Sequence, residues 1–161
     1  IAAQLLGAAT GQILVILHFW PHWKVTLDGD AKRACFCTAP AIRAPIWNAV
    51  GEAIATMILV FGVLSLGTSP WERDIGSQIT DEWSWFAFGI AGLLWAIGIG
   101  LGGTTGFAIN PARDLAPRIL HAILPIPGKT NSDWGYAWVP IVGPIVGGTL
   151  GAIIAKTFGF C

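Results

Sequence analysis

The residues best suited to handle a solute lie in the segment 106–118, which reads Gly-Phe-Ala-Ile-Asn-Pro-Ala-Arg-Asp-Leu-Ala-Pro-Arg. Asn110 followed by Pro111 is typical of a helix start, because asparagine caps a helix and proline fits its first turn. Arg113 keeps its charge and offers several N–H donors, which suit hydroxyl or water oxygens. A fixed charge and an interrupted backbone are both costly in lipid. Between apolar segments, the pattern therefore indicates a path for a solute across a membrane.

One face of this expected helix carries its polar residues. Residues three and four apart share a helical face, and the set at that spacing is Asn110, Arg113, Asp114 and Pro117. The alternative is an interfacial helix whose Arg113 and Arg118 reach lipid headgroups. The glycine-rich lead-in at 102–106 favours the pore, because irregular backbone at membrane depth must line a wet cavity or be buried in protein.

The elements that must position this segment are long and apolar. Of the 161 residues, 54% are hydrophobic and 11% are charged, against about 25% charged in ordinary soluble domains. Four stretches hold at most one Asp, Glu, Lys or Arg: 1–23, 44–71, 83–112 and 134–155. Because roughly 20 apolar residues cross a bilayer, each predicts a spanning helix.

The helix that begins at Pro111 is too short to join them. Up to about Leu124 it has room for about 14 residues, or about 20 Å, which cannot cross a core of about 30 Å. The sequence therefore predicts an all-α membrane protein with four spanning helices and one re-entrant half-helix, all in a single membrane channel domain over 1–161. Residues 24–45 are expected to form a long polar loop, and 68–81 a short polar link.

With Arg113, the flanking helices and the spacing, the segment 106–118 resembles the second signature loop of the aquaporin family, in its glycerol-facilitator branch. The resemblance covers the whole chain, from a third spanning helix to a sixth, and implies an aquaporin-like helical bundle. In that family two half-helices meet at mid-membrane, and four identical subunits assemble. The opening helices and the first Asn-Pro-Ala loop are absent, so we expect these residues to belong to a longer chain.

The resemblance also implies which residues form the pore. Asn110 marks the pore centre, and Arg113, Phe107 and Gly98 form the selectivity constriction of the glycerol type. Glycine in place of an imidazole widens the narrowest ring, and Phe107 gives an apolar wall for a carbon chain. Asp114, with the basic Arg118 four residues later, also matches the glycerol-facilitator pattern.

Further residues are expected to hold the pore loop in place. Glu52, with Thr56 one turn on, resembles a family motif in which the acid accepts hydrogen bonds from the backbone of the signature loop. We interpret it as a scaffold rather than a proton relay. The other members of the expected scaffold are Gly106, Pro111, Ala112 and Asp114. Two sets of glycines four residues apart are expected to let helices pack closely: Gly143, Gly147 and Gly151, and Gly7 with Gly11.

Several other functions are disfavoured. A formal net charge of zero argues against nucleic acid as a partner. The sequence contains no evident nucleophile–base set, phosphate loop or paired acid site, so we do not expect an enzyme. His18, His22 and His121 lack metal-ligand spacing with the cysteines. They are expected at the membrane interface, and we expect no metal and no cofactor.

The function expected is a passive, multi-pass channel in the plasma membrane for glycerol and other small uncharged solutes, with water also passing. Its partners would be these solutes, the lipid bilayer and three further copies of itself. Two alternatives remain open. One is a water-selective or non-conducting membrane protein of the same fold. The other is a secondary transporter, for which Glu52 would be the lone candidate for a coupled ion site.

Overall fold

The computed structural model describes residues 1–67 and 82–160, with the backbone alone given for 82–85. The polar link expected at 68–81 lies outside the described residues. Throughout the described part the regular structure is helical and no strand is present, which confirms the expected all-α class. The helices are α1 (Ala2–His18), α2 (His22–Val25), α3 (Gly29–Ala34), α4 (Pro45–Gly67), α6 (Glu82–Leu101), α7 (Pro111–Ile123) and α8 (Val139–Thr157).

Two of the four expected spans are long and apolar enough to cross a bilayer in full. These are α4, with 23 residues, and α8, with 19. The other two are α1, which has 17 residues, and α6, which has 20 residues and whose side chains are described from Phe86 onward. The first helix stops at His18 because Phe19 leaves the helical conformation, with φ −91° and ψ 13°. The chain then turns into α2 instead of continuing to residue 23.

The half-helix is present as α7, which has 13 residues and a length of about 20 Å. It begins at Pro111, directly after Asn110, and stops one residue before the expected end. The expectation for the long loop needs a partial correction. We expected residues 24–45 to be irregular, but they include α3, whose first turn is capped by Asp28. The carboxylate of Asp28 accepts hydrogen bonds from the N–H groups of Asp30 and Ala31.

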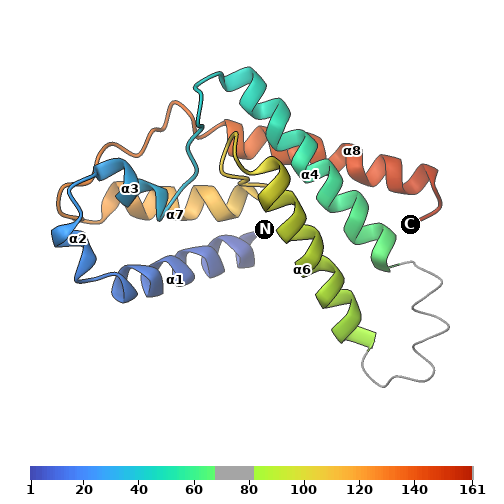
Figure 1. Ribbon diagram of the computed structural model, residues 1–161, viewed down its shortest axis with the longest axis horizontal. Coiled ribbons are helices and arrows are strands. Elements are labelled where there is room, and N and C mark those ends of the chain that lie inside the picture. The colour runs from blue at the N-terminus through green and yellow to red at the C-terminus, as the bar shows by residue number, and fades with distance from the viewer. Residues whose placement is uncertain (68–81, 161) are drawn as a thin grey trace.

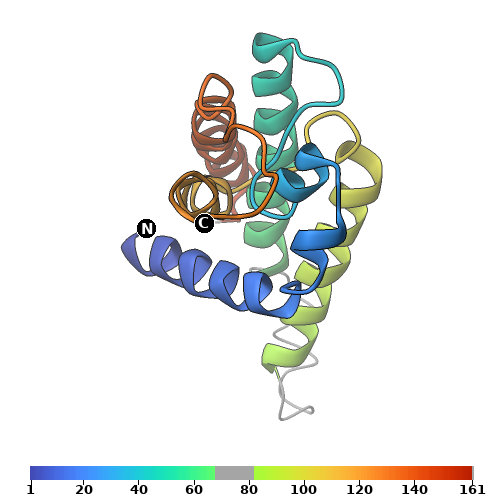
Figure 2. The ribbon, with the colours of Figure 1, turned by 90° about the vertical axis from the view of Figure 1, so that its left-hand side faces the viewer.

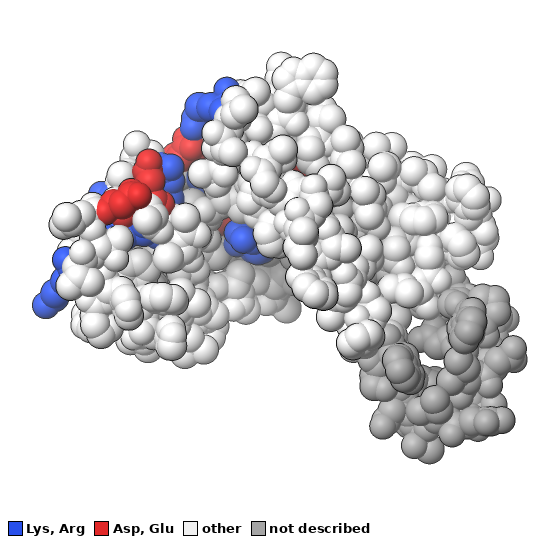
Figure 3. Space-filling model, in the orientation of Figure 1, with Lys and Arg blue, Asp and Glu red and all other residues white. Residues whose placement is uncertain are grey.

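The helices form two groups (Figures 1 and 2). The helices α4, α6 and α8 lie together, and α4 packs mainly on α8. On the other side, α1 runs alongside α7, with α2 and α3 at the end where α7 finishes. The charged residues on the face in Figure 3 gather at that same end, while the surface over α4 and α8 is almost free of charge. The charge distribution fits a molecule whose polar end lies at a membrane surface.

Glycines form the contact between α4 and α8, as expected. A Cβ added to Gly143 would lie 2.6 Å from the Cβ of Glu52, and one added to Gly151 would lie 2.6 Å from the carbonyl oxygen of Met57. At Gly147 it would overlap the backbone of Ala53. We call these three glycines and the backbone of α4 the glycine seam. Gly7 and Gly11 of α1 differ, since a Cβ there meets nothing within 4 Å in this chain.

Candidate functional site

The approach to α7 is an irregular loop held in an unusual conformation. Gly106 has φ 79°, which glycine adopts freely, but Phe107 has φ 38° and Ile109 has φ 43°. Positive φ is uncommon for residues with a side chain, above all for a β-branched one, and such strain persists only where surrounding contacts enforce it. A group outside the loop must therefore hold it in place.

Glu52 provides that group. This side chain from α4 is 1% exposed. Its two carboxylate oxygens accept hydrogen bonds from the N–H groups of Ala108, at 2.9 Å, and Ile109, at 2.8 Å. Thr56, one turn on, donates instead to the backbone carbonyl of Glu52, at 2.7 Å. Both carboxylate oxygens of Glu52 are thus committed to the loop that carries the positive φ angles.

Asn110 ends the loop and starts the helix. Its backbone is extended, with φ −155°, and its side-chain oxygen accepts from the N–H groups of Ala112, at 2.8 Å, and Arg113, at 3.4 Å. Pro111 occupies the first helical position, where a missing N–H is harmless. The cap uses the oxygen of the Asn110 amide, so the NH2 group, a donor, is left for other partners.

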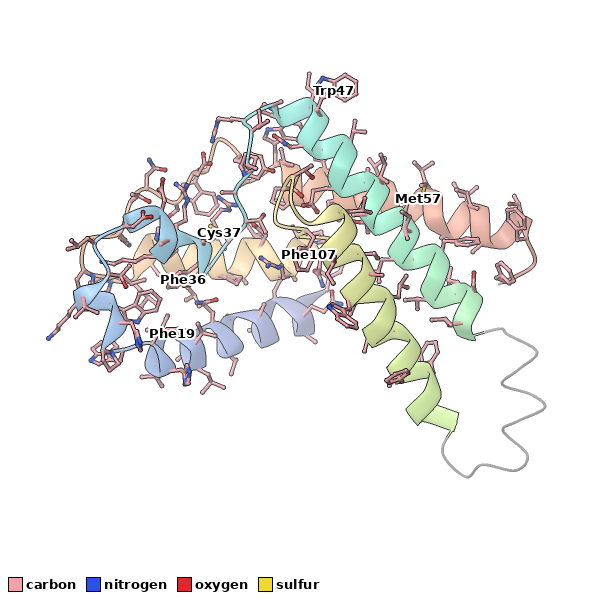
Figure 4. The ribbon with its side chains drawn as sticks, in the orientation of Figure 1. Phe19, Phe36, Cys37, Trp47, Met57 and Phe107 are labelled. Atoms are coloured by element: carbon pink, nitrogen blue, oxygen red, sulfur yellow. The ribbon has the colours of Figure 1, made fainter. Side chains whose placement is uncertain are left out.

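Phe107 and Gly98, nine positions apart in the sequence, come together. A Cβ added to Gly98 would lie 3.4 Å from the Cζ atom of Phe107. Phe107 is 36% exposed and lies beside the last turns of α6 (Figure 4). The ring therefore lies against Gly98, and a larger residue at position 98 would press on the ring or displace it.

Arg113 and Asp114 are neighbours with opposite environments. Arg113 is exposed in this chain, whereas Asp114 is buried. The expectation that these two share one helical face with Asn110 is therefore only partly right, because Asp114 turns toward the protein and Arg113 does not. The charge of Arg113 is left available to a solute or to further protein.

The polar residues of the buried face of α7 tie the helix to two loops. One Asp114 carboxylate oxygen accepts from the N–H and the hydroxyl of Thr38, both at 2.7 Å. The other accepts from Nε of Arg118, also at 2.7 Å. Arg118, with no exposed surface, donates in addition to the carbonyls of Thr38 and Ser132. The alternative in which Arg118 reaches lipid headgroups is therefore wrong.

His121 belongs to the same buried face. The expectation that it lies at the membrane interface is wrong, because its side chain has no exposed surface. Its Nδ1 atom lies 2.8 Å from the hydroxyl of Ser132, and its ring packs edge-on against Phe36. We call Thr38, Asp114, Arg118, His121 and Ser132 the outer clasp. Sequence reasoning missed it, although polar residues at 114, 118 and 121 recur at helical spacing and were a usable signal.

An exposed ion pair lies beside the outer clasp. Arg43, from the loop before α4, makes two hydrogen bonds of 2.8 Å to the carboxylate of Asp133, in the loop before α8. These bonds hold the pKa of Asp133 below its usual range. Cys37, next to Thr38, is buried in the same region (Figure 4). Burial raises the pKa of its thiol to about 11, so it is a poor nucleophile near neutral pH.

The described residues contain no group of three or more His, Cys, Asp or Glu side chains placed to hold a metal ion. The arrangement is instead a helix N-terminus with an unused amide donor, a free guanidinium and an aromatic wall. By their chemistry, the amide and the guanidinium are hydrogen-bond donors and the ring is apolar.

Comparison with known proteins points the same way. Residues 1–155 match the family model described as major intrinsic protein. The chain is 53% identical over 152 residues to a probable glycerol uptake facilitator protein of Thermotoga maritima. The matched region covers 94% of this chain and 61% of that protein. The chain is 49% identical over 153 residues to a glycerol uptake facilitator protein of Bacillus subtilis (95% and 52%). It is also 50% identical over 153 residues to glycerol uptake facilitator protein 3 of Lactiplantibacillus plantarum (95% and 60%).

The chain thus spans between about half and three fifths of the length of these relatives. The family comprises integral membrane channels rather than enzymes. With its all-helical fold, its capped half-helix and a match over nearly all its residues, the chain belongs to the major intrinsic protein family.

Proposed function

We propose that the protein containing this chain is a passive channel for glycerol and other small uncharged solutes, with water also passing, in the plasma membrane. In this proposal residues 1–161 supply part of a single channel domain, and four copies assemble. Asn110 stands at the pore centre, and Arg113, Phe107 and Gly98 form the constriction. Gly106, Glu52, Pro111, Ala112 and Asp114 hold the pore loop. The names of the relatives support glycerol as the solute.

The contact between Gly98 and Phe107 is the observation that carries the proposal. The aromatic ring stands 3.4 Å from where a Cβ at position 98 would be, so any side chain larger than glycine competes for the space in front of the ring. A three-carbon polyol needs that space for its apolar edge. Its hydroxyls need donors, which the exposed Arg113 and the NH2 group of Asn110 offer. A water-selective channel needs less width and no apolar wall.

The secondary-transporter alternative is disfavoured by the surroundings of Glu52. A carboxylate that carries a coupled proton or ion must be free to exchange it. Both oxygens of Glu52 instead accept backbone hydrogen bonds from the loop at Ala108 and Ile109. These charge-assisted bonds hold a strained loop, so the carboxylate is already occupied. A scaffold role for Glu52 is therefore the better proposal.

The test is stopped-flow permeability of the complete protein in liposomes, with glycerol and water measured in parallel. We expect Gly98→His to lower the ratio of glycerol to water permeability by about tenfold or more, which corresponds to about 1.4 kcal/mol in the barrier. Gly100→His is the matched control. It makes the same substitution on the same helix, at a position where a Cβ would meet nothing within 4 Å.

Two results would count against the proposal. An unchanged ratio in Gly98→His would remove Gly98 from the constriction. Absence of any glycerol entry into liposomes that hold the unsubstituted protein, with water entry intact, would favour the water-selective alternative. Uptake that saturates and follows an ion gradient would favour the transporter.

A further inference from the structure

We propose that the outer clasp is an acid-release device, in which protonation of His121 loosens residues 36–38 from α7. The observations that carry it are the unpaired nitrogen of a fully buried imidazole, the cations around it and the single network that joins it to Thr38. The proposal does not depend on which solute the protein conducts.

The first observation is the incomplete hydrogen bonding of the ring. His121 has no exposed surface, and its Nε2 atom has no hydrogen-bond partner. The other nitrogen, Nδ1, is paired with the hydroxyl of Ser132. A neutral imidazole has one N–H, but a protonated one has two. The charged ring would therefore bury an N–H donor without an acceptor, whichever tautomer the neutral ring adopts.

The second observation is the charge around His121. Lys129, in the loop after α7, donates to the carbonyls of His121, Ala122 and Leu124, which holds its ammonium at the end of the helix, where its charge acts on the ring. Arg118 lies one turn earlier on the same helix, and Arg33 of α3 acts on the ring from the loop side. Each of these cations disfavours a further positive charge on the imidazole.

The nearby carboxylates do not offset these cations, because each is already paired. Asp114 bonds Arg118 and Thr38, Asp133 bonds Arg43, and Asp30 bonds Arg33. The two other helices that pack on α7 add little charge. The helix α1 carries no Asp, Glu, Lys or Arg, and the only one of these residues in α8 is Lys156, in its last turn. Glu52 of α4 is committed to the pore loop.

The third observation links His121 to the loop. Ser132 pairs with His121 through its hydroxyl and with Arg118 through its carbonyl. Arg118 in turn bonds the carbonyl of Thr38, and the ring of His121 touches Phe36. A charge that pushes His121 or Ser132 out of place thus acts on two of the contacts that hold residues 36–38 on α7. The others are the two hydrogen bonds from Thr38 to Asp114, the carboxylate that pairs with the same Arg118.

The pH range follows from the direction of the shift. Burial, and then the charge of Lys129, lowers the pKa of His121 from 6.5 to about 4. With the clasp open, the ring regains its ordinary pKa. A depressed pKa in the closed state means that the closed clasp is fully favoured above about pH 6.5 and weakens as the pH falls toward 4. By linkage, the ratio of open to closed clasp rises about 20-fold between pH 7 and pH 5.

Labelling of Cys37 tests the proposal directly, because this thiol is 1% exposed and precedes Thr38. The complete protein is reconstituted with every other cysteine, including Cys35 and Cys161, replaced by serine. It is then labelled with 4,4′-dithiodipyridine, which reacts in acid. We expect the ratio of the rate at pH 5 to the rate at pH 7 to exceed that of the His121→Asn variant by about 20-fold. The asparagine keeps a polar atom near Ser132 but cannot titrate.

The matched control is His22→Asn, which removes an exposed histidine of α2 and should keep the wild-type response. Equal rate ratios in the wild type and in His121→Asn would overturn the proposal. If His121→Asn does not fold, hydrogen exchange of the wild type decides. After correction for intrinsic exchange, residues 36–38 should lose protection between pH 7 and pH 5 while residues 139–157 keep it. Unchanged protection of residues 36–38 would equally overturn the proposal.

Discussion

The glycine seam and the outer clasp join helices by opposite means. In the glycine seam, α8 lies so close to α4 that a single added carbon would overlap backbone atoms, and the contact needs no charge. In the outer clasp, a fully buried carboxylate and guanidinium hold a helix against two loops through directed hydrogen bonds. The seam therefore depends on shape, and the clasp depends on charge and on complete pairing.

The comparison explains where the molecule can respond to its surroundings. The close packing of backbones at Gly147 and Gly151 is insensitive to pH and salt, because no titratable group takes part in it. A buried ion pair is sensitive to the loss of either partner, since the remaining charge has no solvent to receive it. The pore loop is held by two hydrogen bonds to the carboxylate of Glu52, from the seam helix α4, whereas residues 36–38 depend on the clasp.

The largest effect is expected from Asp114→Leu in the outer clasp. The substitution leaves Arg118 buried without its carboxylate and should lower the free energy of unfolding by about 3–5 kcal/mol. Thermal or denaturant unfolding in detergent, followed by tryptophan fluorescence, measures the loss. The double variant Asp114→Leu with Arg118→Met should recover most of it. A single variant as stable as the wild type would show that the clasp pair contributes nothing.

A smaller effect is expected from Gly147→Ala in the glycine seam. The new methyl group would overlap the backbone of Ala53, which should cost about 1–3 kcal/mol through overpacking. The matched control is Gly148→Ala, whose added carbon would make ordinary contacts of 3.6 Å and 3.9 Å. The same unfolding assay compares the two. Equal midpoints for both variants would mean that the seam is looser than its geometry indicates.

The smallest effect is expected from Arg43→Gln in the exposed ion pair beside the clasp. Exposed pairs contribute only a small free energy and are screened by salt. We expect a loss of that size at low ionic strength that shrinks at 1 M salt. Because the pKa of Asp133 is lowered by Arg43, the contribution exists above the ordinary carboxyl range and disappears as the pH falls through the folded-state value. If the loss persisted in high salt, the pair of Arg43 and Asp133 would behave like a buried pair, as in the outer clasp, and not like an exposed one.

The sequence predicted the half-helix well and the surroundings of its polar residues poorly. Asn110, Pro111 and the preceding glycines act on the backbone next to them. The cap of α7, its first residue and its short length therefore followed from residue type. Arg118 and His121 misled the prediction because a charged residue near an apolar helix usually reaches headgroups or water. Their burial depends on Thr38 and Ser132, which lie 80 and 14 residues from Arg118 in the chain.

By itself the sequence determined the helical membrane class, the half-helix after Asn110 and the likeness to a channel family, since hydrophobic length, capping and local spacing are properties of neighbouring residues. Only the tertiary structure decided the rest. It brought Phe107 against Gly98, gave both oxygens of Glu52 to the strained loop, and enclosed Asp114, Arg118 and His121 in one network. These outcomes depend on which distant segments meet, and burial, which sets the energy of every charge, exists only once they have met.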